Sequence, residues 1–269
     1  MKKPLIFILG CLISVSCSQK SGNAQTESEL TTKKLTYAFE QDKLEVAIDI
    51  DYPDGLNGIL QNALCEFFSE ALGGSYEGDL ADGQKMIDHY GEIFKAELIK
   101  EYEEQREDLS EDNLNGFYRK FVIEKVYETE KLVTFAVAEE IYMNGAHGMH
   151  YSHGQTFRKS DGRRFNSDMM RNMGSLEMHT VIKEGLREYF SEMSGESVGD
   201  EKLKDYILSG DDIDYLPMPA YTPYVTKDGI VFVYQPYEIS FYAAGMPSFI
   251  VSLDDMKPYL TYTARQLLL

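Results

Sequence analysis

The sequence predicts an α+β fold in which antiparallel sheets pack against helices, organised as two adjoining α+β domains. Three observations lead to this prediction. Several segments alternate apolar and polar residues, as half-buried strands do, and others repeat apolar residues every three or four positions, as amphipathic helices do. The predicted helices and strands also come in blocks, whereas strict β-α-β alternation would indicate a parallel sheet.

The N-terminal domain is predicted over residues 35–145 and begins with a hairpin and two helices. Its strands are recognised by alternation, and its first helix by an apolar face that Gly73 and Gly74 bring to an end. A three-stranded antiparallel meander follows, with Thr129 and Glu130 as one of its tight links. The expected elements are, in order, strands 35–39 and 44–50, a turn at 52–55, helices 56–71 and 82–107, and strands 117–128 and 131–143; the third strand of the meander, 151–158, falls beyond residue 145.

The C-terminal domain is predicted over residues 146–269. Apolar stripes predict its helices, and Lys227-Asp228-Gly229 predicts the turn of a hairpin. A terminal helix is expected after the last strand, with Asp254 as its N-cap. The expected elements are helices 174–192 and 200–208, hairpin strands 224–226 and 230–234, strand 248–253 and the terminal helix.

The first residues have the pattern of a secretory signal. Two lysines precede an apolar run over 4–15, which is shorter than the ~20 residues of a membrane span. Small residues then lead into Cys17, and the chain turns polar at once, which resembles the lipobox of bacterial lipoproteins. We therefore expect a signal peptide over 1–16, an acylated Cys17, and a flexible tether over 17–34. Acylation of Cys11 and an ordinary secretory signal without lipid are the alternatives.

Composition limits the function. Acidic residues outnumber basic ones 45 to 26, giving a formal charge of −19, which argues against charge-driven binding of nucleic acid. The same charge favours solubility and suits a basic partner. With Cys17 acylated, Cys65 is the remaining thiol of the mature chain, so the fold must be held by its core; the apolar neighbours of Cys65 predict a buried, inert thiol.

A glycine- and histidine-rich segment over 145–153 is the first candidate site. His147, His150 and His153 invite a metal-site hypothesis because imidazole binds zinc and copper. On an extended strand, however, His147 and His153 face one side and His150 the other. The sequence has no HExxH motif, so we expect no metal and no cofactor, and a structural role for His147.

The second candidate is the aromatic segment over 234–247. Pro236 and Pro247 bracket a loop that we expect to be rigid, and such aromatic-rich loops make good binding surfaces for sugars or partner proteins. Within it, Glu238 is either a structural carboxylate that accepts backbone hydrogen bonds or a general acid. We expect this loop to pack beside the 144–150 turn, because both are rich in small residues that permit close approach.

The run Pro236-Tyr237-Glu238-Ile239-x-x-Tyr242-Ala243-Ala244-Gly245 resembles the signature of the RsiV-like ectodomain family, which includes parts of the anti-sigma factor RsiV and of the deacetylase PdaC. The Gly145-Ala146-His147 segment is similar to that family's Gly-Gly-Ala-His turn, with Asn144 in place of the first glycine. The resemblance covers residues 35–260. Phe241 departs from it, since the family often has proline there.

The resemblance implies a binding function, because RsiV-like ectodomains resemble sensors and RsiV itself binds lysozyme. The binding residues carried over are Tyr237, Glu238, Tyr242, Gly245, His147 and Gly145. We therefore expect a lipid-anchored cell-envelope module that binds a cell-wall glycan or a lysozyme-like protein and has no catalytic residue. The rival hypotheses are an envelope glycan hydrolase that pairs Glu238 with Asp161 or Asp254, and a structural lipoprotein without a small ligand.

Overall fold

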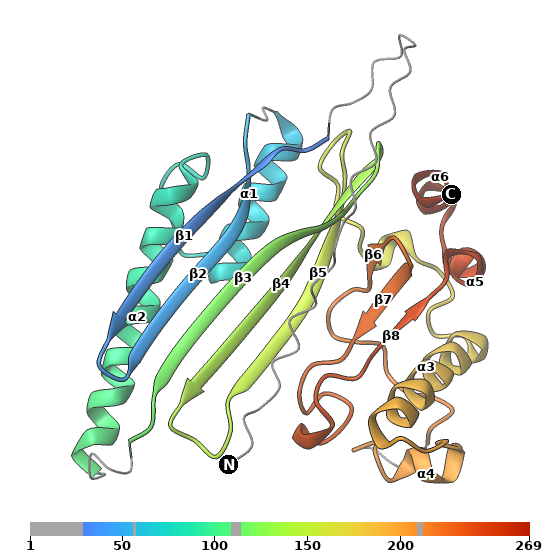
Figure 1. Ribbon diagram of the computed structural model, residues 1–269. Helices are drawn as coiled ribbons and strands as arrows, with labels where there is room; N and C mark the ends of the chain where they lie inside the picture. The colour runs from blue at the N-terminus through green and yellow to red at the C-terminus, as the bar shows by residue number, and fades with distance from the viewer. Residues whose placement is uncertain (1–28, 56–57, 109–113, 209–211) are drawn as a thin grey trace, which may run out of the picture.

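The computed structural model describes residues 29–55, 58–108, 114–208 and 212–269. The predicted signal peptide, Cys17 and most of the predicted tether lie outside the described residues. The described chain is an α+β protein with a five-stranded and a three-stranded sheet, so the predicted fold class is confirmed (Figure 1). No helix in these described ranges has the length and apolar composition needed to cross a membrane.

The first part of the molecule is a sheet of order β1-β2-β3-β4-β5, with two helices covering one face (Figure 1). Its elements are β1 Thr32–Gln41, β2 Leu44–Pro53, α1 Ile59–Leu72, α2 Gly83–Asp108, β3 Phe117–Glu128, β4 Leu132–Met143 and β5 Met149–Arg158. The predicted helices and strands are thus present, although β1 begins at Thr32 and takes in the end of the predicted tether.

One strand pair departs from the antiparallel pattern. Strands β2 and β3 run parallel, with Leu44 opposite Phe117, whereas the other neighbouring strands are antiparallel. A parallel pair requires a long crossover, and α1 and α2 lie between β2 and β3 in the chain. Both helices therefore pack on the same sheet face and bury its alternate residues, such as Val46, Ile48 and Ile50.

Cys65 belongs to this first core. It is buried on α1, and its Sγ lies 3.0 Å from Tyr52 Oη. Burial raises the pKa of the Cys65 thiol, so the thiol form is favoured. The prediction of a buried cysteine is confirmed.

The second part is a sheet of order β6-β7-β8 packed against α3 and the C-terminal helices (Figure 1). Its elements are η2 Ser167–Met169, α3 Leu176–Ser194, α4 Asp200–Lys204, β6 Tyr224–Thr226, β7 Gly229–Val233, η3 Tyr242–Ala244, β8 Ser248–Val251, α5 Leu253–Met256, η4 Lys257–Tyr259 and α6 Tyr262–Leu268. Its core includes buried residues such as Leu186, Phe190 and Phe232.

Two predictions about the C-terminal region need correction. The terminal helix is broken into α5, η4 and α6, because Pro258 lies near the start of η4 and cannot donate a backbone hydrogen bond. The N-cap of α5 is Ser252 rather than Asp254: the Ser252 hydroxyl accepts from the Asp255 amide, and Asp254 lies inside the first turn.

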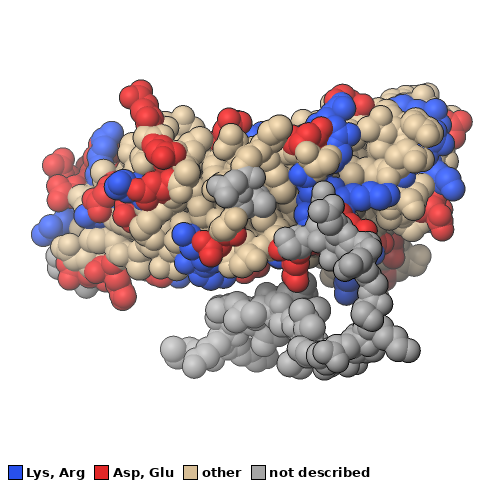
Figure 2. All heavy atoms as spheres, turned by 90° about the horizontal axis from the view of Figure 1, so that it is seen from above, with Lys and Arg blue, Asp and Glu red and all other residues tan. Residues whose placement is uncertain are grey.

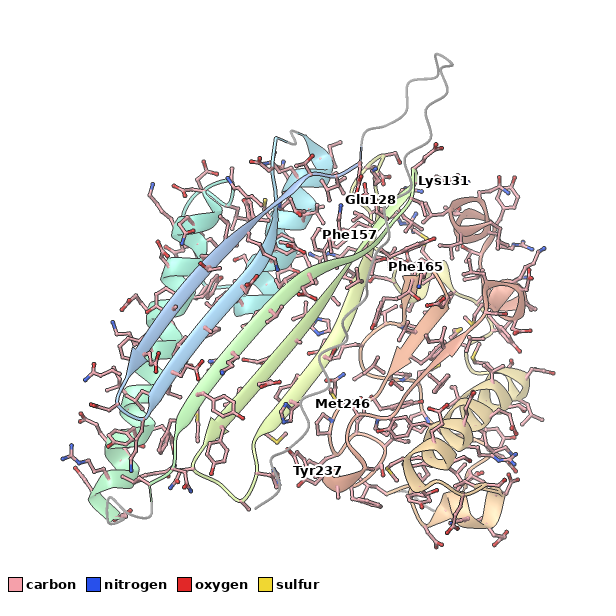
Figure 3. The ribbon with its side chains drawn as sticks, viewed as in Figure 1. Glu128, Lys131, Phe157, Phe165, Tyr237 and Met246 are labelled. Atoms are coloured by element: carbon pink, nitrogen blue, oxygen red, sulfur yellow. The ribbon has the colours of Figure 1, made fainter. Side chains whose placement is uncertain are left out.

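The two parts meet along β5 and β6. Strand β5 lies beyond the predicted boundary at 145/146 but belongs to the first sheet, and its Phe157 is buried in the first core. Phe165, which follows shortly after β5, is buried in the second core, and the Phe165 amide donates to Thr156 O on β5. The chain therefore passes from the first core to the second just after β5 (Figure 3).

Candidate functional site

The 144–150 turn and the 235–247 loop lie side by side, as predicted. The ring of His147 stacks on that of Tyr242, with 3.6 Å between ring centroids and 17° between ring planes. His147 Nε2 lies 3.3 Å from Tyr237 Oη, and the Tyr242 hydroxyl donates to Gly148 O. We call the surface made by His147, Tyr237 and Tyr242 the aromatic surface.

The aromatic surface is open to solvent. Tyr237 is 50% exposed and His147 is also exposed, while Tyr242 is half-buried between them. The rings of Tyr237 and Tyr242 are 5.7 Å apart and inclined by 32°. Segments about ninety residues apart in the chain thus present three rings together.

Gln235 ties the loop to β5. Its side-chain Oε1 accepts from the Ser152 amide at 3.1 Å, and its Nε2 donates to Ser152 O at 2.7 Å. The side-chain amide therefore bonds to both backbone groups of Ser152, much as a neighbouring strand would. Gln235 is buried, and its two bonds satisfy the polar groups that burial removes from water. The sequence offered only a weak signal for this residue, a polar side chain directly after a buried strand.

Glu238 has a structural position. Its Oε1 accepts from the Ala220 amide at 2.5 Å and its Oε2 accepts from the Gln235 amide at 2.7 Å. Both carboxylate oxygens are therefore engaged with backbone donors, which favours the structural alternative over the general acid. The bond from the Gln235 amide, together with that from the Glu238 amide to Gln235 O, closes the turn that contains Tyr237, whose φ is +65°. Few non-glycine residues occupy this left-handed region, and those that do are commonly held there by their surroundings.

Gly245 and Asn144 take conformations that match their residue types. Gly245 has φ +74°, and a Cβ built on it would lie 3.2 Å from Tyr189 Oη, which donates to the neighbouring Ala244 O. Asn144 has φ +57°, a region that asparagine tolerates better than most residues, so it can stand where the family has glycine. Gly145 lies exposed at the tip of the turn, and its carbonyl accepts from Tyr142 Oη at 3.1 Å.

Phe241 is compatible with the backbone that proline would require. Its φ is −69°, within the range that the proline ring imposes. The ring of Phe241 is 38% exposed and lies 6.3 Å from that of Tyr206. The departure from the family's proline therefore changes the side chain presented at this position, not the φ angle.

The three neighbouring histidines have separate partners. His147 contacts Tyr237 and Tyr242, the Nδ1 of His150 lies 3.8 Å from a Glu140 oxygen, and His153 stacks on Tyr221. Among the described residues, no group of three or more His, Cys, Asp or Glu side chains is placed to hold a metal ion.

Asp161 and Asp254, which the hydrolase hypothesis pairs with Glu238, lie in other parts of the molecule. Arg158 Nε, at the C-terminal end of β5, donates to Asp161 at 2.7 Å, whereas Glu238 accepts from the amide of Gln235, whose side chain bonds to Ser152 on β5. The extended strand from Ser152 to Arg158 spans roughly 20 Å. Paired glycosidase carboxylates lie ~5–9.5 Å apart. Asp254 lies on α5, which is well separated from the labelled Tyr237 (Figures 1 and 3).

Residues 168–254 match the family model described as "Protein of unknown function (DUF3298)". The match includes the 235–247 loop, whereas the 144–150 turn lies outside it. This match supports a relationship to DUF3298 over residues 168–254. The link to RsiV-like ectodomains stays a prediction. No curated protein matches the sequence.

Among the solved structures that share the fold are two members of the DUF3298 family. A DUF3298 family member from Bacteroides fragilis NCTC 9343 superposes with a TM-score of 0.65 at 18% identity, covering 89% of this chain and 97% of that chain. A DUF3298 family protein from Pseudomonas aeruginosa PAO1 superposes with a TM-score of 0.57 at 14% identity, covering 89% of this chain and 98% of that chain. At these identities the likeness concerns the fold.

Proposed function

We propose that this chain is a binding module of the cell envelope, without catalytic activity, whose aromatic surface contacts a macromolecular ligand. An acyl group on Cys17 holds it at the membrane. The ligand is a lysozyme-like protein in the first place and a cell-wall glycan in the second. The observation that carries the proposal is the gathering of His147, Tyr237 and Tyr242 on one exposed surface.

The exposure of this surface favours a large partner. Small-molecule sites are concave and bury most of their ligand, whereas Tyr237 projects from a turn and is half exposed. Tyrosine is enriched among the residues that dominate the binding energy of protein interfaces. Its aromatic body is apolar and its hydroxyl can donate or accept, so it suits an interface that is partly wet.

The charge of the chain also suits a basic protein. The formal net charge is −19, and complementary fields raise association rates and disfavour wrong partners. On the face seen in Figure 2, acidic and basic side chains are interspersed rather than separated into two patches. We therefore expect charge to contribute through the overall field, and the aromatic side chains to provide the close contacts.

The occupied carboxylate of Glu238 supports a module without catalysis. An acid catalyst must deliver a proton to its substrate, but here both oxygens accept bonds from backbone amides. Glu238 instead shapes the turn that presents Tyr237.

The test is calorimetric binding of lysozyme to the chain without its signal, with peptidoglycan digestion measured in parallel. We expect Tyr237→Ala to weaken binding by about 2 kcal/mol or more, as at an interface hot spot. Tyr215→Ala is the matched control, since Tyr215 is 60% exposed but lies outside the aromatic surface. Affinity should also fall as salt rises.

Three results bear against the proposal. Equal losses in Tyr237→Ala and Tyr215→Ala would remove the aromatic surface as the site. Sugar release from peptidoglycan that disappears in Glu238→Gln would make the chain a hydrolase. Mass spectrometry of the membrane-extracted protein should find lipid on an N-terminal Cys17, and a mature chain that still contains Leu12 would refute that anchor.

A further inference from the structure

A pocket of about 370 Å³ lies where the two parts of the molecule meet. Its walls come from α1, from β5 and the segment that follows it, and from the loop before β6. The lining residues that matter here are Phe67, Glu70, His153, Gln155, Arg164 and Tyr221. We call it the junction pocket. Its volume is within the ~300–1,000 Å³ typical of small-ligand sites.

One wall of the junction pocket is aromatic. The ring of Tyr221 stacks on that of His153, with 4.1 Å between centroids and 13° between planes, and His153 meets Phe67 edge-on at 6.4 Å. Tyr221 nevertheless remains 43% exposed. The stack therefore fixes the orientation of Tyr221 while leaving part of its ring available. A fixed aromatic ring offers a flat apolar surface at little further cost in side-chain entropy.

The pocket also holds polar groups that a ligand could bond to. His153 lines the pocket, with its half-buried ring between those of Tyr221 and Phe67. Burial lowers the pKa of His153 to about 4, so at neutral pH the ring has one donor and one acceptor nitrogen. The Nε2 of Gln155 donates to Thr156 O and Phe165 O, which leaves its Oε1 as an acceptor. Such groups can bond to water or to a ligand that enters the pocket.

The charges in the pocket cancel. Arg164 Nη1 lies 2.7 Å from Glu70 Oε2, and the guanidinium also lies over the Phe67 ring at 5.6 Å. A site without surplus charge favours a neutral ligand. Because the pair leaves further guanidinium N–H groups and carboxylate lone pairs, it offers both donors and acceptors at one place.

We propose that the junction pocket binds one ring of a neutral sugar. The aromatic wall of Tyr221 contacts the C–H face of the ring. His153, Gln155 and the Arg164–Glu70 pair bond to its hydroxyl or acetamido groups. The site shares no residue with the aromatic surface, so the two proposals stand or fall separately.

The experiment uses chitotriose, a neutral trimer of N-acetylglucosamine, as the probe. Saturation-transfer NMR should detect its binding to the wild-type ectodomain, and titration should shift the imidazole signals of His153. We expect Tyr221→Ala to raise the dissociation constant at least tenfold, while Tyr221→Phe stays within about threefold, because the ring and its stack are kept. Tyr215→Ala should leave the dissociation constant unchanged.

Thermal unfolding of each variant shows whether it is folded. No binding of chitotriose to the wild type at millimolar concentration would overturn the proposal. So would an equal loss in Tyr221→Ala and Tyr215→Ala, or binding that leaves the His153 signals unmoved. Tighter binding of a carboxylate-bearing sugar that is lost on removing Arg164 would replace the neutral ligand with an acidic one.

Discussion

His153 shows how one side chain can link the fold to pH. It lies between Phe67 of the first core and Tyr221 of the second part, in contact with both rings. Its imidazole is largely shielded from water without gaining an opposite charge, and this desolvation lowers its pKa to about 4. The charged groups that line the pocket, Glu70 and Arg164, are paired with one another.

This lowered pKa predicts acid sensitivity. As pH falls from about 6.5 to about 4, the unfolded chain binds a proton at His153 before the folded chain does, so the free energy of unfolding decreases through that window. The contribution is about 1–3 kcal/mol, because the ring is only partly shielded from solvent. Above pH 7 both states are neutral at this residue and the contribution vanishes.

The variant His153→Phe should therefore lose less stability than the wild type between pH 7 and pH 4.5. Denaturant unfolding at the two values measures the difference. Tyr262→Phe is the control, because Tyr262 is 70% exposed and the substitution leaves every histidine and carboxylate in place. All three proteins contain the same carboxylates, so the differences between their curves report the substituted residue. Identical curves for His153→Phe and the wild type would contradict this account.

At the scale of the elements, the spacing of apolar residues predicted the helices and strands because those same residues are the buried ones. Strand β2 alternates between buried and half-buried residues over nearly its whole length, and α3 buries Met178, Ile182, Leu186 and Phe190 at spacings of four. Such patterns are local. What the sequence did not indicate was the parallel pairing of β2 with β3, which depends on where α1 and α2 lie across the sheet.

The candidate site, too, was predictable from the sequence only in part. The signature residues of the loop and the histidine turn pointed to two segments, and close approach was expected from their small residues. The bonds that fix the loop were not foreseeable, because Gln235 and Ser152 are far apart in the chain and nothing local requires them to meet. The same holds for Ala220, whose amide binds Glu238, and for Tyr221, which stacks on His153.

The cap of α5 gives a prediction at this scale. Ser252 Oγ accepts from the Asp255 amide at 3.2 Å and donates to the Asp255 carboxylate at 2.6 Å, whereas Asp254 has no such bond among the described residues. We expect Ser252→Ala to lower the free energy of unfolding by about 1 kcal/mol. Asp254→Ala should cost only a few tenths, through its favourable position near the helix N-terminus. Thermal unfolding compares them, and the reverse order would restore Asp254 as the cap.

At the scale of the whole molecule, two hydrophobic cores are joined by a small buried polar cluster. Thr134 on β4 and Thr156 on β5 are fully buried, and their hydroxyl oxygens lie 2.8 Å apart. Thr156 Oγ1 also accepts from the Val225 amide of β6 at 2.9 Å. The hydroxyl of Thr156 thus bridges the two sheets, and each polar group at this point depends on it.

Replacing Thr156 by valine keeps the volume but removes that bridge. The Val225 amide and the Thr134 hydroxyl would then be buried without partners, at a cost of about 1–3 kcal/mol for each group. Thr134→Val should cost less, because the bond from Val225 to Thr156 survives. Since Thr156 joins the two sheets, we also expect Thr156→Val to loosen their coupling. Calorimetry should then show a broadened or divided unfolding transition for Thr156→Val, beside a single one for Thr134→Val. Equal losses and equally sharp transitions in the two variants would mean that the cores are held together by apolar contacts alone.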